Sequence, residues 1–309
     1  MAQPRIVIIG AGMAGIACGR ALADAGLSPM IIDKGRSPGG RMSTRRVNDK
    51  TFDHGAQYFT ARGEEFRCAI EAASSIGAVA RWQAAETDGE PRYVGLPGMS
   101  GIVKHLANGL DIQCGVEINA ITQTGNGWTA KSTNGQSIDA DIVVCTAPAP
   151  QAADFFAGSH PFQAALSDVK MMPCWALLVA FDQTFTPGWE TRRSDDTLAW
   201  IAHNGSKLGR ASDCWVVHAS PDWSQDFLEL EKPDAAERLC AELAADFGPL
   251  PEASYIAGHR WRYAMAKKPL GKPFLFDANV YLGGDWALGP RVECAFDSGV
   301  AIARHILSA

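Results

Sequence analysis

The sequence predicts an α/β fold in which a discontinuous Rossmann-like domain is joined to a second, antiparallel-sheet α+β domain. Three observations predict it: an apolar stretch at residues 5–9 runs into a glycine-rich turn, residues 279–285 form another strand followed by glycines and an acid, and residues 151–274 are rich in aromatic strand-forming segments. Because the first and last segments belong to one kind of nucleotide-binding unit, the chain is expected to leave that unit and return to it.

The first observation is the glycine motif at residues 10–15, which precedes a helix expected over residues 16–25. Gly10 permits a tight turn, Gly12 lets the backbone approach a pyrophosphate, and Gly15 lets the helix pack close to the strand. Backbone N–H groups at the helix N-terminus are then free to bind the anion. The residues predicted to contact a dinucleotide here are Gly10, Gly12, Ala14 and Gly15.

A second apolar strand, at residues 30–32, ends on Asp33 and Lys34. A carboxylate at the position of Asp33 can accept hydrogen bonds from a ribose diol. The order of strand, glycine turn, helix, strand and acid predicts dinucleotide binding, with Asp33 and Lys34 in the site. The alternative is a tight turn in an unrelated α/β domain.

A second glycine pair follows directly, within residues 37–44. Gly40, Arg41 and Met42 can bring backbone amides and a cation onto a diphosphate. The segment resembles the GG-R-x-[ST] element of the amine oxidase and glutathione reductase superfamily of flavoproteins, in which the arginine and its neighbours meet the FAD diphosphate. The alternative is a solvated basic loop, because two more arginines follow.

The C-terminal segment favours FAD as the dinucleotide. A strand ends in a glycine pair and Asp285, and a final helix runs to about Leu307. In the same superfamily the aspartate lies against the ribityl chain, and the next helix N-terminus points at the flavin, where its dipole stabilises negative charge on the reduced ring. The alternative for Asp285 is an ordinary helix cap. The residues implied in cofactor binding here are Asp285, Trp286, Val292 and Glu293.

The composition is that of a soluble enzyme with a large core. Of the 309 residues, 47% are hydrophobic and 20% are charged, so two domains are expected. A net charge of -6 without a basic stripe predicts no contact with nucleic acid or with a membrane. Eight cysteines without a CxxC pair, and seven histidines that do not cluster with them, predict a cytoplasmic protein without a metal site and with dissociable FAD. No signal peptide or membrane span is expected.

The nucleotide-binding domain is predicted to consist of residues 1–85, 102–150 and 275–309, and the substrate domain of residues 86–101 and 151–274. In the first domain, residues 111–121 and 127–133 are expected to form adjoining strands, and residues 139–148 a buried strand. By the resemblance to the superfamily, the backbone of Val116 is expected to meet adenine.

The substrate domain shows apolar, aromatic-rich strands and one amphipathic helix. The strands are expected at residues 175–181, 198–202 and 215–219, and the helix at residues 233–247. This pattern suits an antiparallel sheet with flanking helices, laid over the flavin to make a substrate cavity.

Longer stretches resemble bacterial renalase-type flavoproteins, which are small FAD-dependent relatives of the amine oxidase fold. The stretches are GAGMAGIACGRAL, SPGGRMSTRR, FDHGAQYFTAR, LAWIAHNGSKLGR, WVVHASPDW, HRWRYA and GGDWALGPRVECAF, and they extend over nearly the whole chain. The glycine motifs are shared widely, whereas DHGAQYFTAR, NGSK and HRWRYA are much more discriminating.

The resemblance implies oxidation of dihydronicotinamide isomers, the 1,2- or 1,6-dihydro forms of NAD(P), to NAD(P)+. Dioxygen would then take the electrons and give hydrogen peroxide. Hydride would pass from the dihydropyridine ring to flavin N5, driven by the gain of aromaticity. Little acid–base help is needed, which agrees with a sequence that has no convincing catalytic dyad or triad. The protein must hold the two rings face to face and exclude water.

Gly55, Ala56 and Gln57 match the family segment that meets the flavin ring. Gly55 lets the backbone pass close to the ring, and Gln57 can hydrogen-bond the polar rim. Tyr58 follows them, either beside the substrate and flavin or as a core aromatic. His54 is expected to have a structural role or a minor flavin contact, because neighbouring strand residues face opposite ways and exclude a pair with Asp53.

Asn204 is predicted to donate to a nicotinamide carboxamide, and the alternative is a turn asparagine before glycine. Residues 259–263 are expected to form a strand that places Trp261 and Tyr263 on one face, near the substrate, with core packing as the alternative. Trp286 is expected to wall the flavin. The residues predicted to position the substrate are therefore Tyr58, Asn204, Trp261 and Tyr263.

Two other functions stay open at this point. One is a flavin amine oxidase, or a dehydrogenase acting on another small donor, for which Trp and Tyr residues could form an amine cage. The other is a protein that binds FAD without redox chemistry. A hydrolase is not supported, because the sequence has no G-x-S-x-G elbow.

Overall fold

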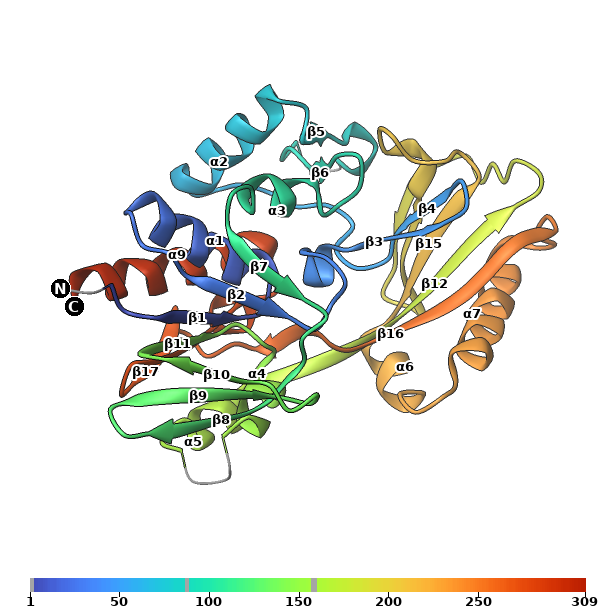
Figure 1. Cartoon of the computed structure of the whole chain (residues 1–309). Coiled ribbons are helices and arrows are strands. Elements are labelled where there is room, and N and C mark those ends of the chain that lie inside the picture. Colours follow the sequence, from blue (N-terminus) through green and yellow to red (C-terminus); the bar gives the residue numbers. More distant parts are fainter. Residues whose placement is uncertain (1–2, 87–88, 157–159) are drawn as a thin grey trace.

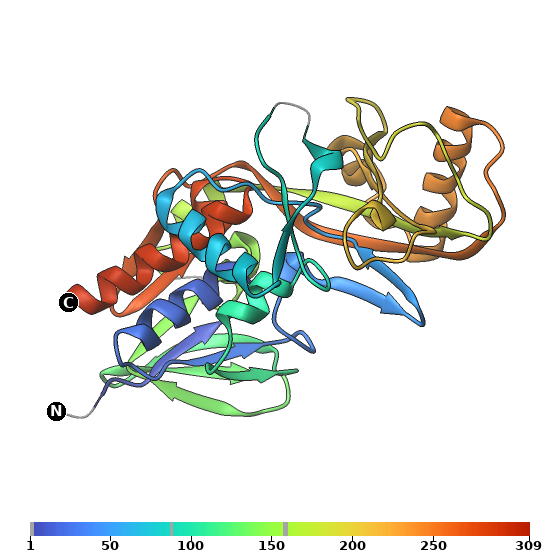
Figure 2. The same ribbon diagram turned by 90° about the horizontal axis from the view of Figure 1, so that it is seen from above.

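A parallel sheet at one end of the molecule and an antiparallel sheet at the other make up the structure, a computed structural model that describes residues 3–86, 89–156 and 160–309 (Figures 1 and 2). Six strands form the first sheet, in the order β17-β18-β11-β1-β2-β7. Their bounds are Phe274–Asp277 (β17), Val280–Gly283 (β18), Ile142–Cys145 (β11), Ile6–Ile9 (β1), Met30–Asp33 (β2) and Asp111–Cys114 (β7). The edge strand β17 is antiparallel and the other strands are parallel. The predicted α/β fold with a Rossmann-like sheet is confirmed.

Strand β1 separates two hydrophobic clusters, because successive side chains point to opposite faces of a sheet. Ile6 and Ile8 pack on a helical layer. Its helices are α1 (Met13–Asp24), α2 (Glu64–Ser75), α3 (Gly101–Leu106) and α9 (Val292–Ser308). Val7 and Ile9 pack on the opposite layer, a three-stranded sheet with two short helices. This layer holds β8 (Ile118–Thr124), β9 (Gly127–Ser132), β10 (Ser137–Ala140), α4 (Ala149–Asp154) and α5 (Gln163–Asp168).

Two predicted strands are each divided between two sheets. The strand predicted at residues 111–121 is β7 in the parallel sheet and β8 in the three-stranded sheet, because Gly115, with φ of +77°, turns the chain between them. The strand predicted at residues 139–148 is likewise divided, at Asp141, into β10 and β11. The first helix also begins earlier than predicted, at Met13. Alternation of apolar residues alone could not show which sheet each half joins.

The antiparallel sheet has the order β13-β14-β15-β12-β16. Its strands are Thr191–Arg193 (β13), Leu198–His203 (β14), Cys214–Ala219 (β15), Lys170–Phe181 (β12) and Ala253–Lys268 (β16). Helix α7 (Lys232–Phe247) covers one face, with α6 (Pro221–Asp226) at its end. The hairpin β3 (Thr44–Val47) and β4 (Lys50–Asp53) covers the other through Phe52.

Strands β12 and β16 are longer than predicted and reach from the antiparallel sheet to the parallel one (Figure 1). Ala266, near the end of β16, packs in the same cluster as Val280 and Leu282 of β18. Only residues 259–263 of β16 were expected to form a strand, because its half-buried side chains include many charged ones and give it no apolar face. The two strands tie the sheets together.

One domain boundary differs from the prediction. Strand β6 (Tyr93–Gly95) pairs with β5 (Val79–Arg81), and Val94 and Met99 pack in the cluster that contains α1. Residues 86–101 were assigned to the substrate domain, but their described part packs on the nucleotide-binding side. The remaining short helices are η1 (Gly40–Met42), η2 (Gln83–Ala85), η3 (Asn204–Ser206) and α8 (Asp285–Leu288).

Gly299 sets how closely α9 crosses α1. A Cβ atom there would lie 2.1 Å from the backbone oxygen of Ala14. We therefore expect Gly299→Ala to lower the free energy of unfolding in urea by about 1–3 kcal/mol, the usual effect of overpacking. Gly19→Ala is the matched control, because its Cβ would meet the movable end of the Ile31 side chain at 2.7 Å. An equal loss in both variants would contradict this account.

Candidate functional site

Two glycine-rich loops meet at the carboxyl ends of β1 and β2. A Cβ atom on Gly40 would lie 3.3 Å from the Cα of Gly12, whereas a Cβ on Gly12 itself would meet no atom within 4 Å. Gly12 is the N-cap residue of helix α1, and no side chain caps the helix. Its first N–H groups can therefore bind an anion, and the space beside Gly12 is open to one.

The first loop has the close packing that the motif predicts. A Cβ on Gly15 would lie 1.9 Å from the oxygen of Gly10, so any larger residue would push the helix away. Ala14 and Met42 are buried in the helical-layer core, and their side chains point away from the loops. Only their backbone atoms are available to a dinucleotide.

Asp33 holds the two loops in place. Its carboxylate accepts hydrogen bonds from the N–H groups of Ala11 and Gly35, both at 2.6 Å. A carboxylate has about four acceptor positions, so a ribose diol can still bind, and that contact stays a prediction. Lys34 is exposed and forms an ion pair with Glu117 at 3.7 Å. The N–H of Val116 donates to the Asp33 carbonyl at 3.0 Å, which leaves only its carbonyl for adenine.

Arg41 and Asp285 meet although they are 244 residues apart in the chain. Nη1 of Arg41 donates to Oδ2 of Asp285 at 2.9 Å, and Nη2 donates to Oδ1. Nη1 also donates to the Ala264 carbonyl of β16 at 2.9 Å. A guanidinium has five N–H donors, so Arg41 can bind a diphosphate oxygen while it keeps this pair.

The open glycine cradle, the uncapped α1 terminus and this arginine together fit an FAD molecule. The glycines and α1 would hold the diphosphate, and Arg41 would add the cation. Helix α9 follows its N-cap residue Arg291, again without a side-chain cap, so the N–H groups of its first turn are free; that they face the flavin stays a prediction.

Two residues predicted to bind the cofactor have their side chains elsewhere. Glu293 is 2% exposed, and its Oε1 accepts the N–H groups of Arg62 and Gly63 at the start of α2, at 2.7 and 2.6 Å. Trp286 is fully buried, and its Nε1 donates to the Ala147 carbonyl at 3.0 Å, so its ring packs in the core and a contact with the flavin stays a prediction. Val292 is half-buried against the helical-layer core.

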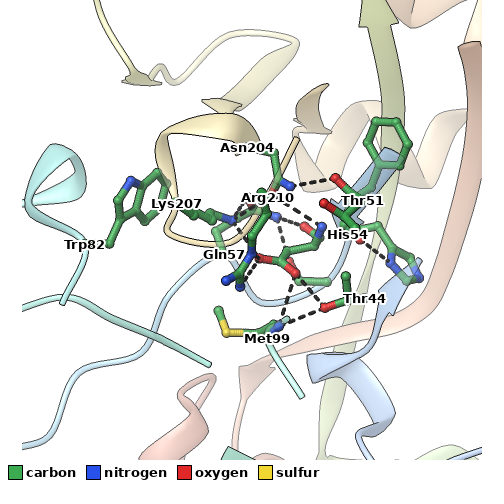
Figure 3. Close-up of polar contacts among 12 residues, drawn as sticks. Thr44, Thr51, His54, Gln57, Trp82, Met99, Asn204, Lys207 and Arg210 are labelled. Carbon is green, nitrogen blue, oxygen red and sulfur yellow. Dashed lines mark hydrogen bonds and ion pairs between the residues drawn. The ribbon is translucent and has the colours of Figure 1, made fainter. Parts of the chain in front are cut away.

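A fully buried ionic cluster lies where the hairpin β3–β4 meets the loop after β14 (Figure 3). One oxygen of Asp53, Oδ2, accepts from Arg210 at 2.7 and 3.1 Å and from Nζ of Lys207 at 3.4 Å. The other, Oδ1, accepts from the Thr44 hydroxyl at 2.6 Å and from the Met99 N–H at 3.2 Å. The side chains of all three charged residues are 0% exposed.

Burial and ion pairing oppose each other in this cluster. Burial raises the pKa of the Asp53 carboxyl, but Lys207 and Arg210 outweigh it and hold that pKa at about 2. Burial lowers the pKa of the Lys207 ammonium to about 8, although Asp53 partly opposes the fall. At neutral pH the cluster therefore holds one carboxylate and two cations.

Gln57 and Asn204 direct their amides into this cluster (Figure 3). Nζ of Lys207 donates to Oε1 of Gln57 and to Oδ1 of Asn204, both at 3.1 Å. The Gln57 amide N–H groups donate to the carbonyls of Asp53 and of Gly55, the latter at 3.2 Å. Gln57 thus has no free amide for the rim of a flavin ring.

Asn204 is 0% exposed, and its Nδ2 donates to the Thr51 carbonyl at 2.7 Å. These contacts use one of the two amide hydrogens, and donation by Asn204 to a substrate carboxamide stays a prediction. The alternative, a turn asparagine before glycine, agrees with its place at the start of η3.

Gly55 lies between Arg41 and Trp261. A Cβ on Gly55 would be 2.0 Å from the Arg41 carbonyl and 3.3 Å from Cζ2 of Trp261, so only glycine fits there. The next N–H, of Ala56, donates to the same carbonyl at 2.9 Å. The Tyr263 carbonyl lies 3.5 Å from Nη1 of Arg41. The structure thus brings Gly55, Ala56, Trp261 and Tyr263 to the arginine loop, and their contacts with flavin or substrate stay predictions.

Tyr58 lies apart from this group. Its hydroxyl accepts from Nη2 of Arg193 at 2.9 Å, and its ring is 5.7 Å from that of Trp200. It packs partly on the helical-layer core, as the alternative for it expected.

Trp261 is surrounded by uncharged histidines. Its ring stacks on His54 at 5.2 Å and lies 4.3 Å from the ring of His259, and its Nε1 donates to the His54 carbonyl at 2.8 Å. That carbonyl is also 3.1 Å from Nε2 of His218. Burial lowers the pKa of His54 and His218 to about 4 and that of His259 to about 3. This aromatic group carries no charge at neutral pH.

Lys207, Arg210 and the role of Asp53 were not predicted from the sequence. Lys207 and Arg210 lie in a polar loop whose composition is typical of an exposed turn. The available signal was Asp53 itself: it follows the apolar Phe52 at the end of a strand, and a buried carboxylate requires cationic partners.

Comparison with known proteins shows the family of the chain. The family described as "Flavin containing amine oxidoreductase" matches residues 63–307, well over half of the chain. The chain belongs to this family. A second profile, described as "NAD(P)-binding Rossmann-like domain", matches residues 8–72. The predicted flavin is therefore confirmed, and FAD is the cofactor of this flavin amine oxidoreductase.

Individual relatives are distant. The chain is 39% identical over 66 residues to hydroxyneurosporene desaturase of Rubrivivax gelatinosus, and this match covers 20% of the chain and 13% of the desaturase. Its fold is similar to that of a candidate protoporphyrinogen oxidase from Exiguobacterium sp. 255-15, with a TM-score of 0.79, 15% identity and full coverage of both chains. Cyclohexylamine oxidase from Brevibacterium oxydans IH-35A gives a TM-score of 0.78 at 14% identity, over 99% of each chain. At identities this low, the structural similarity establishes the shared fold alone.

No helix in the described ranges combines the length and the hydropathy needed to cross a bilayer. The same residues contain no group of three or more His, Cys, Asp or Glu side chains that could hold a metal ion.

Arg41 is expected to retain FAD. We predict that Arg41→Ala lowers the ratio of flavin to protein absorbance after gel filtration more than Arg45→Ala does. Arg45 is the matched control because it is exposed on β3 and lines a groove between α7 and β16. Equal flavin content in the two variants would remove Arg41 from the cofactor site.

The histidine cluster predicts a loss of stability in mild acid. Because its folded pKa of about 4 lies below its ordinary value, His54 binds a proton more readily in the unfolded chain. The free energy of unfolding should fall as the pH drops from about 6.5 to about 4, and His54→Gln should remove about 1–3 kcal/mol of that fall. His105→Gln, in the last turn of α3, is the control. An unchanged pH dependence in His54→Gln would contradict the prediction.

Proposed function

We propose that this protein is an FAD-dependent oxidase of dihydronicotinamide isomers, the 1,2- or 1,6-dihydro forms of NAD(P), and that it returns them to NAD(P)+. FAD, when bound, would supply the two-electron chemistry: the donor loses a hydride, and dioxygen gains the two electrons, the hydride's proton and one proton from solvent to become hydrogen peroxide. The renalase-like stretches of the sequence and family membership support the cofactor and the reaction class.

One observation carries the choice of donor: the aromatic group beside Gly55 holds no base. His54 and His259 are neutral, but their acidic pKa values make them weak proton acceptors. The carboxylate of Asp53 is fully buried and bound by two cations. A dihydropyridine loses a hydride and becomes aromatic without losing a proton, so it suits such a site. An ammonium substrate must first be deprotonated.

The residues of the site then have simple roles. Arg41 and the glycine loops hold the cofactor. Trp261, stacked on His54, offers a flat, uncharged surface against which a planar ring can lie. Gly55 lets Arg41 and Trp261 pack closely on residues 53–57, which fixes the position of Trp261 relative to the arginine loop. Tyr263 continues the same side of β16.

Oxidation of an amine is the second candidate. The family description and the fold shared with cyclohexylamine oxidase favour it. Trp261 and Tyr263 could stack around an amine's carbon chain. We further propose a cytoplasmic location, because all eight cysteines are free thiols, as in a reducing compartment.

Anaerobic mixing distinguishes the donors. We expect a partially isomerised NADH preparation to bleach the flavin within seconds, whereas authentic NADH and cyclohexylamine act slowly or not at all. The measurement is flavin absorbance in a stopped-flow instrument. Bleaching by cyclohexylamine at an equal rate would overturn the proposed donor in favour of an amine.

A further inference from the structure

The buried cluster of Asp53, Lys207 and Arg210 contains more positive than negative charge. Both cations are bonded to the same carboxylate oxygen, and the other partners of the three side chains are neutral groups. These neutral partners are Thr44, Gln57, Asn204, the Met99 N–H and the Leu208 carbonyl, together with the ring of Trp82, which lies 4.7 Å from Nζ of Lys207. Among the residues that the structure describes, one buried positive charge is therefore left without an anion.

An uncompensated charge in a protein interior is costly, and it lowers the cost of placing a negative charge nearby. Burial lowers the pKa of Lys207 to about 8, which means that its charged form is disfavoured in this environment. Lys207 is the cation that is less well compensated, because its contact with Asp53 (3.4 Å) is longer than that of Arg210 (2.7 Å).

Hydrogen bonds connect Lys207 to residues 53–57, the segment that packs against the arginine loop. Lys207 donates to Oε1 of Gln57, and the Gln57 amide donates to the carbonyls of Asp53 and Gly55. Gly55 itself lies between Arg41 and Trp261. Lys207 thus contacts both ends of residues 53–57, through Asp53 and Gln57 (Figure 3), and Gly55 between them packs against Arg41 and Trp261.

We propose that Lys207 is a positioning residue for the flavin. Lys207 holds residues 53–57 in place, and its surplus charge stabilises the negative charge that the flavin ring gains on reduction. Hydride transfer brings two electrons and one proton to the ring, so the ring gains one negative charge and the donor gains one positive charge. The inference rests on the FAD cofactor and on hydride transfer, and it holds for either proposed donor.

Sulfite tests the proposal without any substrate. Its lone pair adds to flavin N5, so the ring gains negative charge with no electron donor present. In Lys207→Met we expect sulfite to bind the FAD-loaded protein about tenfold more weakly, which corresponds to about 1.4 kcal/mol. Folding should survive this change, because it leaves Asp53 and Arg210 as a balanced pair.

Lys50→Met is the matched control. Lys50 also joins strand β4 to the antiparallel sheet, through Asp213 at 2.9 Å, but it lies at the far end of the strand from residues 53–57. Its replacement should leave sulfite binding unchanged. If Lys207→Met lost flavin or stability while its loaded fraction bound sulfite as tightly as the wild type, Lys207 would be structural only and the proposal would be overturned.

The wild type gives a second measurement that needs no folded variant. The reduction potential should fall more steeply with pH from about pH 8 upward, because reduction then also returns a proton to Lys207. Asp53, Arg210 and His218 face Lys207, and the pKa of Asp53, about 2, and that of His218, about 4, both lie far below this range. A single unbroken slope from pH 6 to pH 9.5 would overturn the proposal. Failure of the dihydronicotinamide assay alone would leave both results unaffected.

Discussion

The fully buried carboxylate of Asp53 is the constraint on which the arrangement of this molecule depends. It lies at the end of β4, and its partners come from β3, from the segment before α3 and from the loop after β14. Removing one partner of a buried ion pair costs about 3–5 kcal/mol, because the charge left behind has neither water nor a counter-ion. The nucleotide-binding side and the antiparallel sheet are thus held in a fixed relative position, and the segment through Gly55 is held against Arg41 and Trp261.

Much of the fold could be predicted because its signals are local. The turn at Gly10 and Gly12 and the arginine loop each lie within a few residues, and each was found where the sequence placed it. The second sheet was recognised only in part, since β16 has no continuous apolar face. One divided strand was missed because Gly115 redirects the chain without changing its hydrophobic pattern, and the other because its break at Asp141 lies within one apolar stretch.

In the candidate site, too, local motifs could be predicted from the sequence, whereas contacts between distant residues could not. The pair of Arg41 and Asp285 joins two motifs that the sequence identified separately, although nothing in it showed that they touch. Gln57 and Asn204 were assigned to ligands because an amide is a good donor. Their partner is Lys207, which for Gln57 is 150 residues away. A side chain's hydrogen-bonding capacity can be read from its type, but whether the fold has already used that capacity depends on distant residues. Glu293 illustrates this too: it belongs to a flavin motif, yet its carboxylate binds the start of α2.

The length of β12 and β16 has a mechanical consequence. The two strands are paired along the whole length of β12, from Lys170 opposite Lys268 to Phe181 opposite Ala253. A hinge-like closure of one lobe on the other would have to break this ladder, so the lobes behave as a stiff frame. Small donors must then enter and leave through local movement of side chains and loops at the rim. The turnover of such an enzyme would be gated at its entrance, while the distance between the reacting rings stays set by the frame.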